Sequence, residues 1–392
     1  MHDVIVVGLG PGGATAATDL ARAGLSVLGL EWKTHPRYKV CGGALSARID
    51  RLLEPDYHSV VEDTIHRVRF QFAGTEAFEI TSRDPIAYMV MRDRFDALLV
   101  GKAREAGALV RQNERAVRVH EYADRVEVET QQGRYRAKVV VGADGANSLV
   151  ARTLFPERRG RVVGALEGEV LLNGTTSGLG AGAIVLDLGV VAGGYGWVFP
   201  KEGRLSVGLG GFQGRHRNQR AAYQGFVKTE PTLGGLAVPD GLGHPIPLYA
   251  GKETERLPLT TSRSLLVGDS AHLVDPMLGE GIYYAIMSGR LAARAITDHV
   301  QGLTADLRTY DAGVAGELYP EFRAAARLAW ALYTFPRLVH GALRCRPDTV
   351  HLYADVLKGH TTYQGLLAAL RDRLQNFIAR AVRDTAASAF TR

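Results

Sequence analysis

The sequence predicts an α/β fold, with a Rossmann-type dinucleotide-binding domain, an inserted antiparallel β-sheet domain that holds the substrate and a C-terminal helical region. Three observations predict this fold. A short apolar strand breaks at a glycine cluster near the N-terminus, and further strand segments ending in Gly-Asp or Asp-Gly follow at residues 138–145 and 264–298. The segments between them alternate apolar and polar residues, which is typical of antiparallel strands. The last ninety or so residues are predicted to form helices with apolar faces.

The 392 residues exceed what one compact core accommodates, so we expect two joined domains. The dinucleotide-binding domain is expected in three sections, at residues 1–63, 91–158 and 259–300. The substrate domain is expected at residues 64–90 and 159–258, and the helical region at residues 301–392. Residues 32–47 are polar and contain glycines, and they are predicted to form a loop that enters a helix carrying Ile49 and Leu52.

Composition limits the function classes. The chain is 46% hydrophobic and 22% charged, as in ordinary globular proteins, and its net charge of +6 suits an anionic ligand or an acidic membrane surface but does not indicate nucleic acid. Cys41 and Cys345 lie far apart and match no metal spacing, so we expect no metal and a reducing, cytoplasmic setting. We find no signal-peptide pattern and no run of 18 apolar residues, so no membrane span is expected.

The first 31 residues predict a dinucleotide site. Residues 8–13, Gly-Leu-Gly-Pro-Gly-Gly, supply a G-x-G-x-x-G pattern between a strand at 3–8 and a helix at 12–23. Gly8 permits the tight turn, Gly10 leaves room for a pyrophosphate, and Gly13 lets the helix pack on the sheet. The helix N-terminus presents free N–H groups to the phosphates. Glu31 ends the second strand, where its carboxylate can accept ribose hydroxyls. This unit alone fits either NAD or FAD.

Two later segments favour FAD. A strand runs into Gly268-Asp269, where Asp269 can bind a ribityl hydroxyl. Residues 276–282 then open a helix whose N–H groups can face the flavin pyrimidine and stabilise negative charge on a reduced flavin. Asp144-Gly145 at a strand end is a weaker signal, because Asp-Gly is also a common turn pair.

These segments resemble the flavoprotein superfamily that includes aromatic-ring hydroxylases and geranylgeranyl reductases. Within it, the chain is most similar to the geranylgeranyl reductase family. Residues 36–43 (PRYKVCGG) match its K-x-C-G-G loop, residues 195–201 (YGWVFPK) with Gly208 and Gly210 match its Y-x-W-x-F-P-K…G-x-G signature, and residues 279–285 (GEGIYYA) match its G-E-G-I-x-x-A helix start. Arg92 belongs to an R-x-x-F-D motif whose arginine would reach the cofactor.

The resemblance and the motifs together give a set of expected cofactor-binding residues: Gly8, Gly10, Pro11, Gly12, Gly13, Glu31, Cys41, Gly42, Gly43, Ala44, Arg92, Ala116, Asp144, Gly268, Asp269, Gly279, Gly281 and Ile282. The resemblance implies that reduced flavin saturates C=C bonds of a geranylgeranyl or other polyprenyl chain carried by a lipid, quinone, pigment or diphosphate. It also implies loose contact with the inner face of the membrane. The electron donor is left open between NADPH and a ferredoxin-like protein.

Cys41 is the candidate catalytic residue. An isolated alkene is a poor hydride acceptor, so the site needs tight positioning and a proton donor. The Cys41 thiol would supply that proton or shape the pocket; the alternative is a small apolar side chain that packs against the flavin. Gly42 and Gly43 are expected to let the backbone run close to the ring.

The candidate substrate-binding residues are Tyr195, Trp197, Phe199 and Lys201. Alternation places the three aromatic rings on one strand face, where they either line an apolar channel or form ordinary sheet core. Lys201 either meets an anionic head group or is a solvated surface lysine, and the solvated state is the more common one.

The segment ending in His272 resembles the G-D-A-A-H segment of the hydroxylases. Together with Gly-Ala-Asp-Gly at residues 142–145, it supports an alternative function, a flavin-dependent monooxygenase of the aromatic-hydroxylase type. A proton relay and an ordinary hydrogen-bonded histidine are both open for His272. Glu280, at a helix start, is expected to stabilise the helix N-terminus. A third alternative is a non-catalytic protein that retains FAD as a relic. A long apolar cavity at the flavin favours prenyl chains, whereas a small polar pocket favours an aromatic ring.

Overall fold

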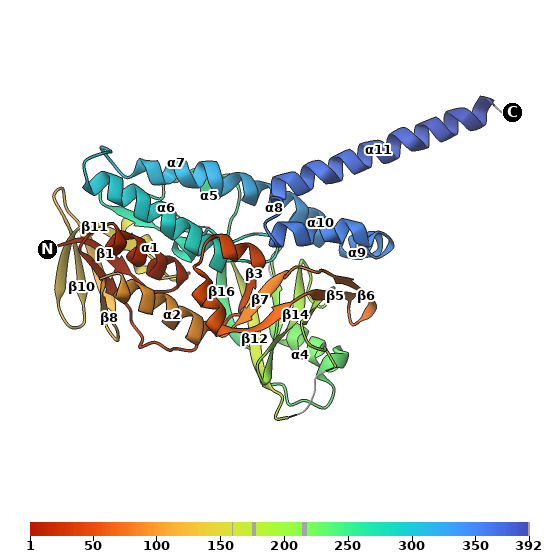
Figure 1. Ribbon diagram of the computed structural model, residues 1–392, viewed down its shortest axis with the longest axis horizontal. Coiled ribbons are helices and arrows are strands. Elements are labelled where there is room, and N and C mark those ends of the chain that lie inside the picture. The colour runs from red at the N-terminus through yellow and green to blue at the C-terminus, as the bar shows by residue number, and fades with distance from the viewer. Residues whose placement is uncertain (159, 175–177, 214–217, 391–392) are drawn as a thin grey trace.

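A sheet with a parallel centre carries the predicted dinucleotide-binding fold. The computed structural model describes residues 1–158, 160–174, 178–213 and 218–390 (Figure 1). The sheet has the order β8-β2-β1-β11-β10-β9, and β17 pairs with β11. The strands are β1 (His2–Val7), β2 (Val27–Leu30), β8 (Leu109–Arg111), β9 (Ala116–Glu121), β10 (Val126–Thr130), β11 (Arg134–Gly142) and β17 (Ser264–Leu266). Strands β2, β1, β11, β8 and β17 pair in parallel, and β9 and β10 add an antiparallel edge.

Small residues bring two helices together behind this sheet. Helix α1 (Pro11–Arg22) packs against α6 (Ile282–Val300), and α2 (Arg92–Glu105) lies beside α1. A Cβ on Gly13 would lie 2.0 Å from the Gly8 carbonyl oxygen, and one on Gly289 would lie 2.4 Å from the Gly12 carbonyl oxygen. Only glycine fits these positions, so the two helix N-termini are held close to the same end of the sheet.

The inserted domain is a second, antiparallel sheet. Its order is β16-β12-β15-β14-β13-β5-β6, with one parallel pair between β13 and β5. One face packs on α4 (Gln219–Thr229) through Tyr223 and Phe226. The opposite face turns toward the first sheet and the C-terminal helices. The strands are β5 (Arg67–Phe72), β6 (Thr75–Thr81), β12 (Arg161–Leu171), β13 (Ala183–Leu188), β14 (Gly194–Lys201), β15 (Arg204–Gly211) and β16 (Leu242–Leu248).

The region between the two sheets is more finely divided than the sequence predicted. Residues 32–47 are not all loop, because Ala44–Ser46 form strand β3. This strand joins a small third sheet, β3-β7-β4, with β4 (Val61–Ile65) and β7 (Ala87–Val90). The expected helix at Ile49 is a short 3-10 helix over Ala47–Arg51, and Leu52 follows it. Of the strands in residues 64–90, β5 and β6 belong to the large antiparallel sheet and β7 does not.

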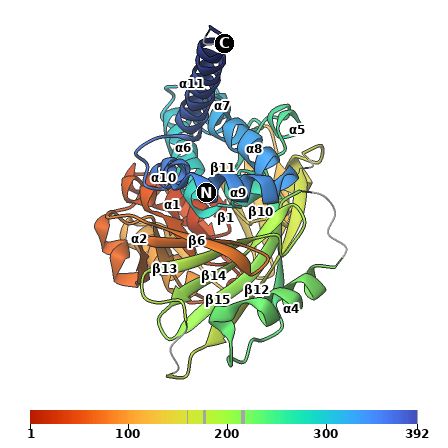
Figure 2. The same ribbon diagram turned by 90° about the vertical axis from the view of Figure 1, so that its right-hand side faces the viewer.

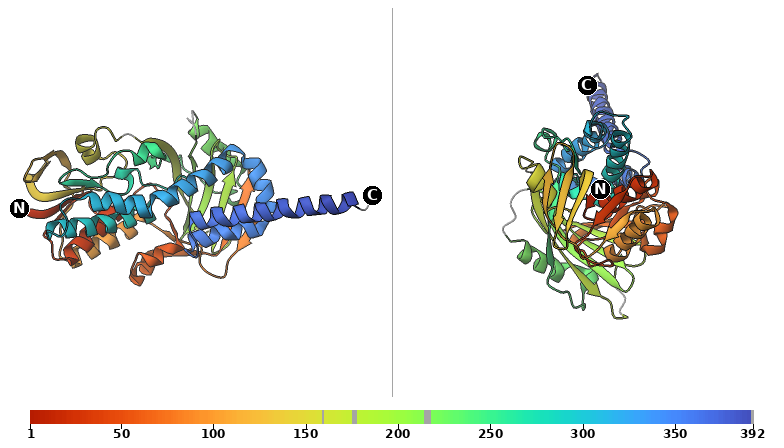
Figure 3. Two further views of the ribbon diagram at one scale, coloured as in Figure 1. Left: turned by 90° about the horizontal axis from the view of Figure 1, so that it is seen from above. Right: turned by 90° about the vertical axis from the view of Figure 1, so that its left-hand side faces the viewer.

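Helices form the C-terminal region, as predicted. They are α7 (Arg308–Glu317), α8 (Tyr319–Thr334), α9 (Pro336–Cys345), α10 (Pro347–Leu357) and α11 (Tyr363–Phe390). Figure 2 shows α9 and α10 beside the second sheet, and Figure 3 shows α11 projecting away from the body. Two further α-helices are short, α3 (Leu149–Leu154) and α5 (Lys252–Glu255). Among the described residues, no helix is both long enough and apolar enough to span a bilayer.

Candidate active site

One cavity of about 880 Å³ lies where the two sheets and the C-terminal helices meet. It extends from the start of α1 to α10, which lie in different parts of the molecule in Figure 1. We call the part lined by the first sheet and the starts of α1 and α6 the cofactor end. We call the part lined by the second sheet and α10 the apolar end. All eighteen residues expected to bind the cofactor line this cavity.

The β1–α1 turn forms one wall of the cofactor end. Gly8 has φ +90°, and a Cβ there would lie 2.5 Å from the Ala143 carbonyl oxygen, so the tight turn requires glycine. A Cβ on Gly10, in contrast, would meet no described atom within 4 Å. Gly10 lines the cavity and precedes the first turn of α1, whose N–H groups lack partners within the helix. This open space beside free N–H groups fits a pyrophosphate.

Glu31 and Arg37 line the same end. The Glu31 carboxylate is buried and accepts hydrogen bonds from Leu9 N (3.0 Å) and Lys33 N (3.2 Å), which fix its orientation. Arg37 lies 3.2 Å from Asp96, yet its Nε and Nη1 atoms make no hydrogen bond to the described residues. A buried guanidinium with free donors suits an anionic ligand. Sequence reasoning assigned no role to Arg37.

Asp269 lies at the other side of the cofactor end, next to the start of α6. A Cβ on Gly281 would lie 3.3 Å from Asp269 Oδ1, so the missing side chain leaves this carboxylate facing the cavity. Burial raises the pKa of Asp269, while Lys39 and Arg92 oppose that rise. An Asp carboxylate at this position can accept hydrogen bonds from a sugar-alcohol chain.

The loop before α6 is held by a buried carboxylate. Asp275 accepts hydrogen bonds from Met277 N (2.9 Å), Leu278 N (3.2 Å) and the Tyr363 hydroxyl (2.9 Å). Tyr195 donates to the Leu278 carbonyl oxygen at 2.7 Å. The substrate-domain strand β14 and helix α11 therefore both fix the loop that carries Gly279 to the N-terminus of α6.

Glu280 in this loop pairs with the buried guanidinium of Arg48 and accepts a hydrogen bond from Ser46. The carboxylate thus ties the start of α6 to the segment around β3. The sequence predicted that Glu280 stabilises the helix N-terminus, but it did not predict this buried ion pair with Arg48.

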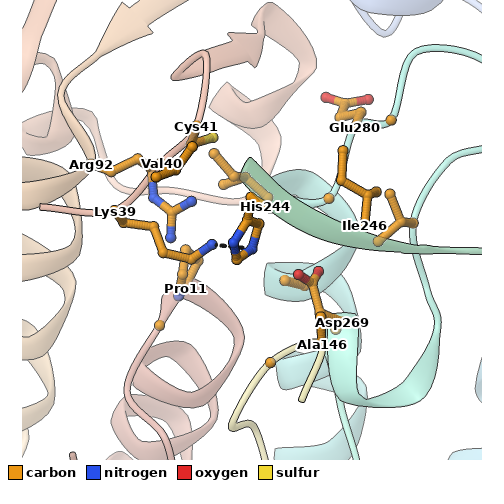
Figure 4. A pocket seen from close by; sticks show the side chains of 18 of the residues that line it. Pro11, Lys39, Val40, Cys41, Arg92, Ala146, His244, Ile246, Asp269 and Glu280 are labelled. Carbon is orange, nitrogen blue, oxygen red and sulfur yellow. Dashed lines mark hydrogen bonds between the residues drawn. The ribbon is translucent and has the colours of Figure 1, made fainter. Parts of the chain in front are cut away.

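Cys41 lines the cavity near the charged side chains of Arg92 and Lys39 (Figure 4). Its Sγ accepts a hydrogen bond from Gly43 N at 3.4 Å. Although burial disfavours a charged Arg92, the neighbouring Asp96 carboxylate and the Cys41 sulfur raise the pKa of Arg92. Arg92 also forms two hydrogen bonds to Asp96, at 2.8 and 2.9 Å. The R-x-x-F-D motif is therefore a buried ion pair that places a guanidinium beside Cys41.

Lys39 and His244 form a second pair that sequence reasoning did not identify. Lys39 Nζ lies 2.6 Å from His244 Nε2, as Figure 4 shows. Burial and the charges of Lys39 and Arg92 lower the pKa of His244 to about 4, so the imidazole is neutral and accepts from the ammonium. Both side chains line the cavity. His244 lies on β16, and no motif around it marks the position.

Asp144 and Ala116 also line the cavity, but Asp144 is already engaged. Its carboxylate accepts hydrogen bonds from Leu149 N (2.6 Å) and the Ser148 hydroxyl at the start of α3. The Asp-Gly segment therefore caps a helix at the rim of the cavity.

The aromatic residues of β14 line the apolar end. Tyr195, Trp197 and Phe199 are buried and lie on one face of the strand, as predicted. The small residues of β15 make room for them, since a Cβ on Gly208 would lie 2.2 Å from the Trp197 ring. Gly42 also packs here, because its Cβ would lie 3.1 Å from the Phe199 ring. The opposite wall and the floor are apolar and consist of Val68, Phe70, Ile80, Ile184, Leu186, Phe212, Ile246, Val350, Tyr353, Ala354 and Leu357.

The expectation that Lys201 is a solvated surface lysine is wrong. Lys201 is buried, not solvated; it pairs with Glu169 at 2.9 Å and is not among the described residues that line the cavity. His272 is likewise absent from the described lining and packs against Gly160, where burial and Arg158 lower its pKa to about 4. Its Nδ1 makes no hydrogen bond to the described residues. His272, one of the two observations that supported an aromatic hydroxylase, is therefore not part of the described cavity lining.

The fold and this cavity define an FAD-dependent oxidoreductase. A family model described as an FAD binding domain matches residues 1–172. The chain is 32% identical over 339 residues to a geranylgeranyl diphosphate reductase of Rhodobacter capsulatus, covering 81% of this chain and 80% of the relative. It is 31% identical over 330 residues to a digeranylgeranylglycerophospholipid reductase of Thermoplasma volcanium, covering 76% and 79%. The chain belongs to the geranylgeranyl reductase family of FAD-dependent oxidoreductases.

A solved structure shows the same fold. The crystal structure of a geranylgeranyl bacteriochlorophyll reductase-like protein from Thermoplasma acidophilum matches with a TM-score of 0.80 at 24% identity, covering 95% of this chain and 98% of that one. The inserted sheet and the C-terminal helices therefore also occur in a solved structure, which confirms the predicted fold class.

The Asp269 carboxylate offers a direct test of the cofactor end. We expect Asp269→Ala to weaken FAD binding by about 10- to 100-fold, because a hydrogen bond to a charged group contributes about 1.5–3 kcal/mol. Titration of the FAD-free protein with FAD, followed by flavin fluorescence, measures this. Asp84→Ala, at an exposed loop position, is the control and should bind FAD as the wild type does. Equal affinities for the two variants would remove Asp269 from the site.

Proposed function

We propose that this oxidoreductase saturates C=C bonds of a geranylgeranyl or other polyprenyl chain. The observation that carries the proposal is the apolar end of the cavity, which is continuous with the cofactor end and walled by aliphatic and aromatic side chains. Such a surface suits a branched hydrocarbon chain, because each buried methylene contributes about 0.8 kcal/mol. It does not offer the small polar pocket that would orient an aromatic ring.

FAD would be held by the residues of the cofactor end. The glycines of the β1–α1 turn and the start of α1 would contact the pyrophosphate, Glu31 the ribose and Asp269 the ribityl chain. When bound, the reduced flavin supplies a hydride to the substrate. The protein's own contribution is to place the double bond, exclude water and hold a proton nearby. Cys41, Lys39 and Arg92 line the cavity close to one another (Figure 4).

The relatives point to chains with different head groups. One relative is named for a diphosphate and the other for a glycerophospholipid, and both names specify geranylgeranyl chains. We therefore propose that the apolar end recognises the prenyl chain of the substrate and not its head group. Lys201 is not proposed as a head-group ligand, because Glu169 already occupies it.

Substrates of this kind reside in membranes, so we also propose peripheral contact with the inner face of the membrane. Exposed apolar side chains lie on α8, on α9 and at the residue between them, just before the helix that lines the apolar end. Trp330 is 59%, Phe335 49% and Leu338 72% exposed. NADPH and a ferredoxin-like protein remain the two proposed electron donors.

The test is anaerobic. Holoenzyme reduced with dithionite is incubated with a geranylgeranylated lipid, and the product is analysed by mass spectrometry. We expect the mass of the lipid to rise by two hydrogens for each double bond reduced. The amount of flavin that is re-oxidised should equal the number of double bonds reduced. Unchanged lipid, together with oxygen uptake and hydroxylation of a small aromatic under air, would establish the monooxygenase instead.

A further inference from the structure

Three charged side chains are buried together on the cavity-facing side of the second sheet. Glu167 and Glu169 lie two residues apart on β12, and Lys201 ends β14. Glu167 is 2% exposed, the Lys201 side chain is 1% exposed and the Glu169 side chain is 13% exposed. Lys201 Nζ lies 2.9 Å from Glu169 Oε1. Burying three charges is costly, and a net charge among them is more costly still.

The hydrogen bonds of the Glu167 carboxyl to the described residues include none from a cationic side chain. Lys201 balances Glu169, and the groups that contact Glu167 are uncharged donors. They are the Ser206 hydroxyl at 3.0 Å, Cys41 N at 3.2 Å and the Tyr38 hydroxyl at 3.3 Å. Glu169 lies two residues from Glu167 on β12, so the two carboxyls share one face of the strand. Two buried carboxylates close to a single ammonium repel each other, which favours a proton on one of them.

Electrostatics agree with this. Burial, and then the charge of Glu169, raise the pKa of Glu167 to about 7, although Lys201 and Ser206 oppose the rise. Two tyrosines lie near Glu167, Tyr38 on the loop and Tyr223 on α4, and burial raises the pKa of each, so both hydroxyls are uncharged at this pH. The hydroxyls of Ser206 and Tyr38 can accept as well as donate, so a protonated Glu167 keeps its partners.

Glu167 lines the cavity next to the Cys41 backbone, on the sheet face that carries the aromatic residues of the apolar end. It lines the cavity together with Cys41 and Trp197. Strand register places Glu167 opposite Gly208, and Gly208 opposite Trp197, so carboxyl and indole share one face. Because Gly208 has no side chain, nothing on the intervening strand separates them on this face.

We propose that Glu167 donates the proton that completes the reduction, and that Glu169 and Lys201 are positioning residues that keep Glu167 protonated at neutral pH. This rests on the proposed function. One alkene carbon gains a C–H bond from the hydride that reduced FAD supplies, and the π bond breaks. The π electrons form the second C–H bond with the proton that leaves the Glu167 oxygen. The alkene is reduced by two electrons, FAD is oxidised by two, and the Glu167 carboxylate regains a proton from water.

This assignment separates Glu167 from Cys41, the donor that the sequence suggested. Only the backbone N–H of Cys41 contacts Glu167, and its thiol accepts from Gly43 N. The thiol then shapes the cavity beside Arg92, which is the alternative that the sequence also left open.

The experiment compares Glu167→Gln, Glu167→Asp and Cys41→Ala holoenzymes with the wild type in single-turnover reduction of a geranylgeranylated lipid by pre-reduced flavin. We expect Glu167→Gln to be slower by about 100-fold or more. The wild-type rate should fall as the pH rises through about 7, and Glu167→Gln should lose this dependence. Glu167→Asp should recover part of the rate, and Cys41→Ala should keep the pH profile. Glu230→Gln, a buried glutamate away from the cavity, is the control.

Two readouts need no turnover. Infrared spectra at pH 6 should show a protonated-carboxyl band that disappears in Glu167→Gln. Because the pKa of Glu167 is raised on folding, wild-type stability relative to Glu167→Gln should fall as the pH rises from 4.5 to about 7.

The outcomes are distinct. A Glu167→Gln enzyme that reduces the lipid at the wild-type rate overturns the proton donor and leaves the proposed function standing. Loss of the pH profile in Cys41→Ala, and not in Glu167→Gln, assigns the proton to the thiol. A wild-type enzyme that reduces no prenyl chain overturns both proposals.

Discussion

Ala354→Trp should abolish reduction of long prenyl chains and leave the flavin in place. Ala354 lies on α10, is buried at 2% exposure and lines the apolar end. An indole there would displace a length of substrate chain. Excluding about four methylenes, at about 0.8 kcal/mol each, lowers kcat/KM by about 100-fold or more.

The measurement is kcat/KM for a geranylgeranylated lipid and for a short isoprenoid with the same head group. The short substrate should be affected far less, because it need not reach α10. Leu357→Trp, one helical turn further along α10, is a second variant, and Ala342→Trp on the exposed side of α9 is the control. Flavin absorbance and the melting temperature verify that each variant is folded. Equal losses for the long and the short substrate would contradict an apolar end that holds the chain.

Gly10→Val should produce a folded protein that cannot hold FAD. Gly10 has φ −71° and ψ −174°, which any residue adopts, and a Cβ there meets no described atom within 4 Å. The valine therefore costs the fold little, but its methyl groups fill the space we assign to the pyrophosphate. We expect affinity for FAD to fall by at least about 100-fold, which corresponds to about 2.7 kcal/mol.

Gly101→Val is the matched control, because Gly101 also has open space at its Cβ position but lies on α2 outside the described cavity lining. The purified Gly10→Val protein should be colourless with a normal circular dichroism spectrum, whereas Gly101→Val should be yellow. A yellow Gly10→Val protein would place the pyrophosphate elsewhere.

Motifs built from glycines predicted the cofactor end well, because each glycine answers a local steric requirement. Gly13 must lie against the Gly8 carbonyl, and Gly281 must leave Asp269 uncovered. Such requirements fix the residue type in the sequence itself. The expected fold class, with its parallel-centred sheet, inserted antiparallel sheet and C-terminal helices, is accordingly what the structure shows.

Glu167 could not be predicted in the same way. On β12, Ala165, Glu167 and Glu169 alternate with Leu166, Gly168 and Val170, and a polar face on a strand ordinarily faces water. Here α4 covers one face and the loop at residues 36–43 covers the other, so both faces are buried. Only the tertiary packing reveals this. Lys201 was misjudged for the same reason, since its partner Glu169 lies on a different strand.

The walls of the cavity come from separate stretches of chain. Everything at the cofactor end lies before residue 290, whereas one wall of the apolar end belongs to α10, beyond residue 346. Changes in α10 therefore alter the shape offered to a substrate without touching a residue that holds FAD. In evolutionary terms, substrate range can diverge through this helix while the redox machinery is inherited intact. Exchange of α10 between relatives is accordingly the shortest route to an enzyme with a different chain-length preference.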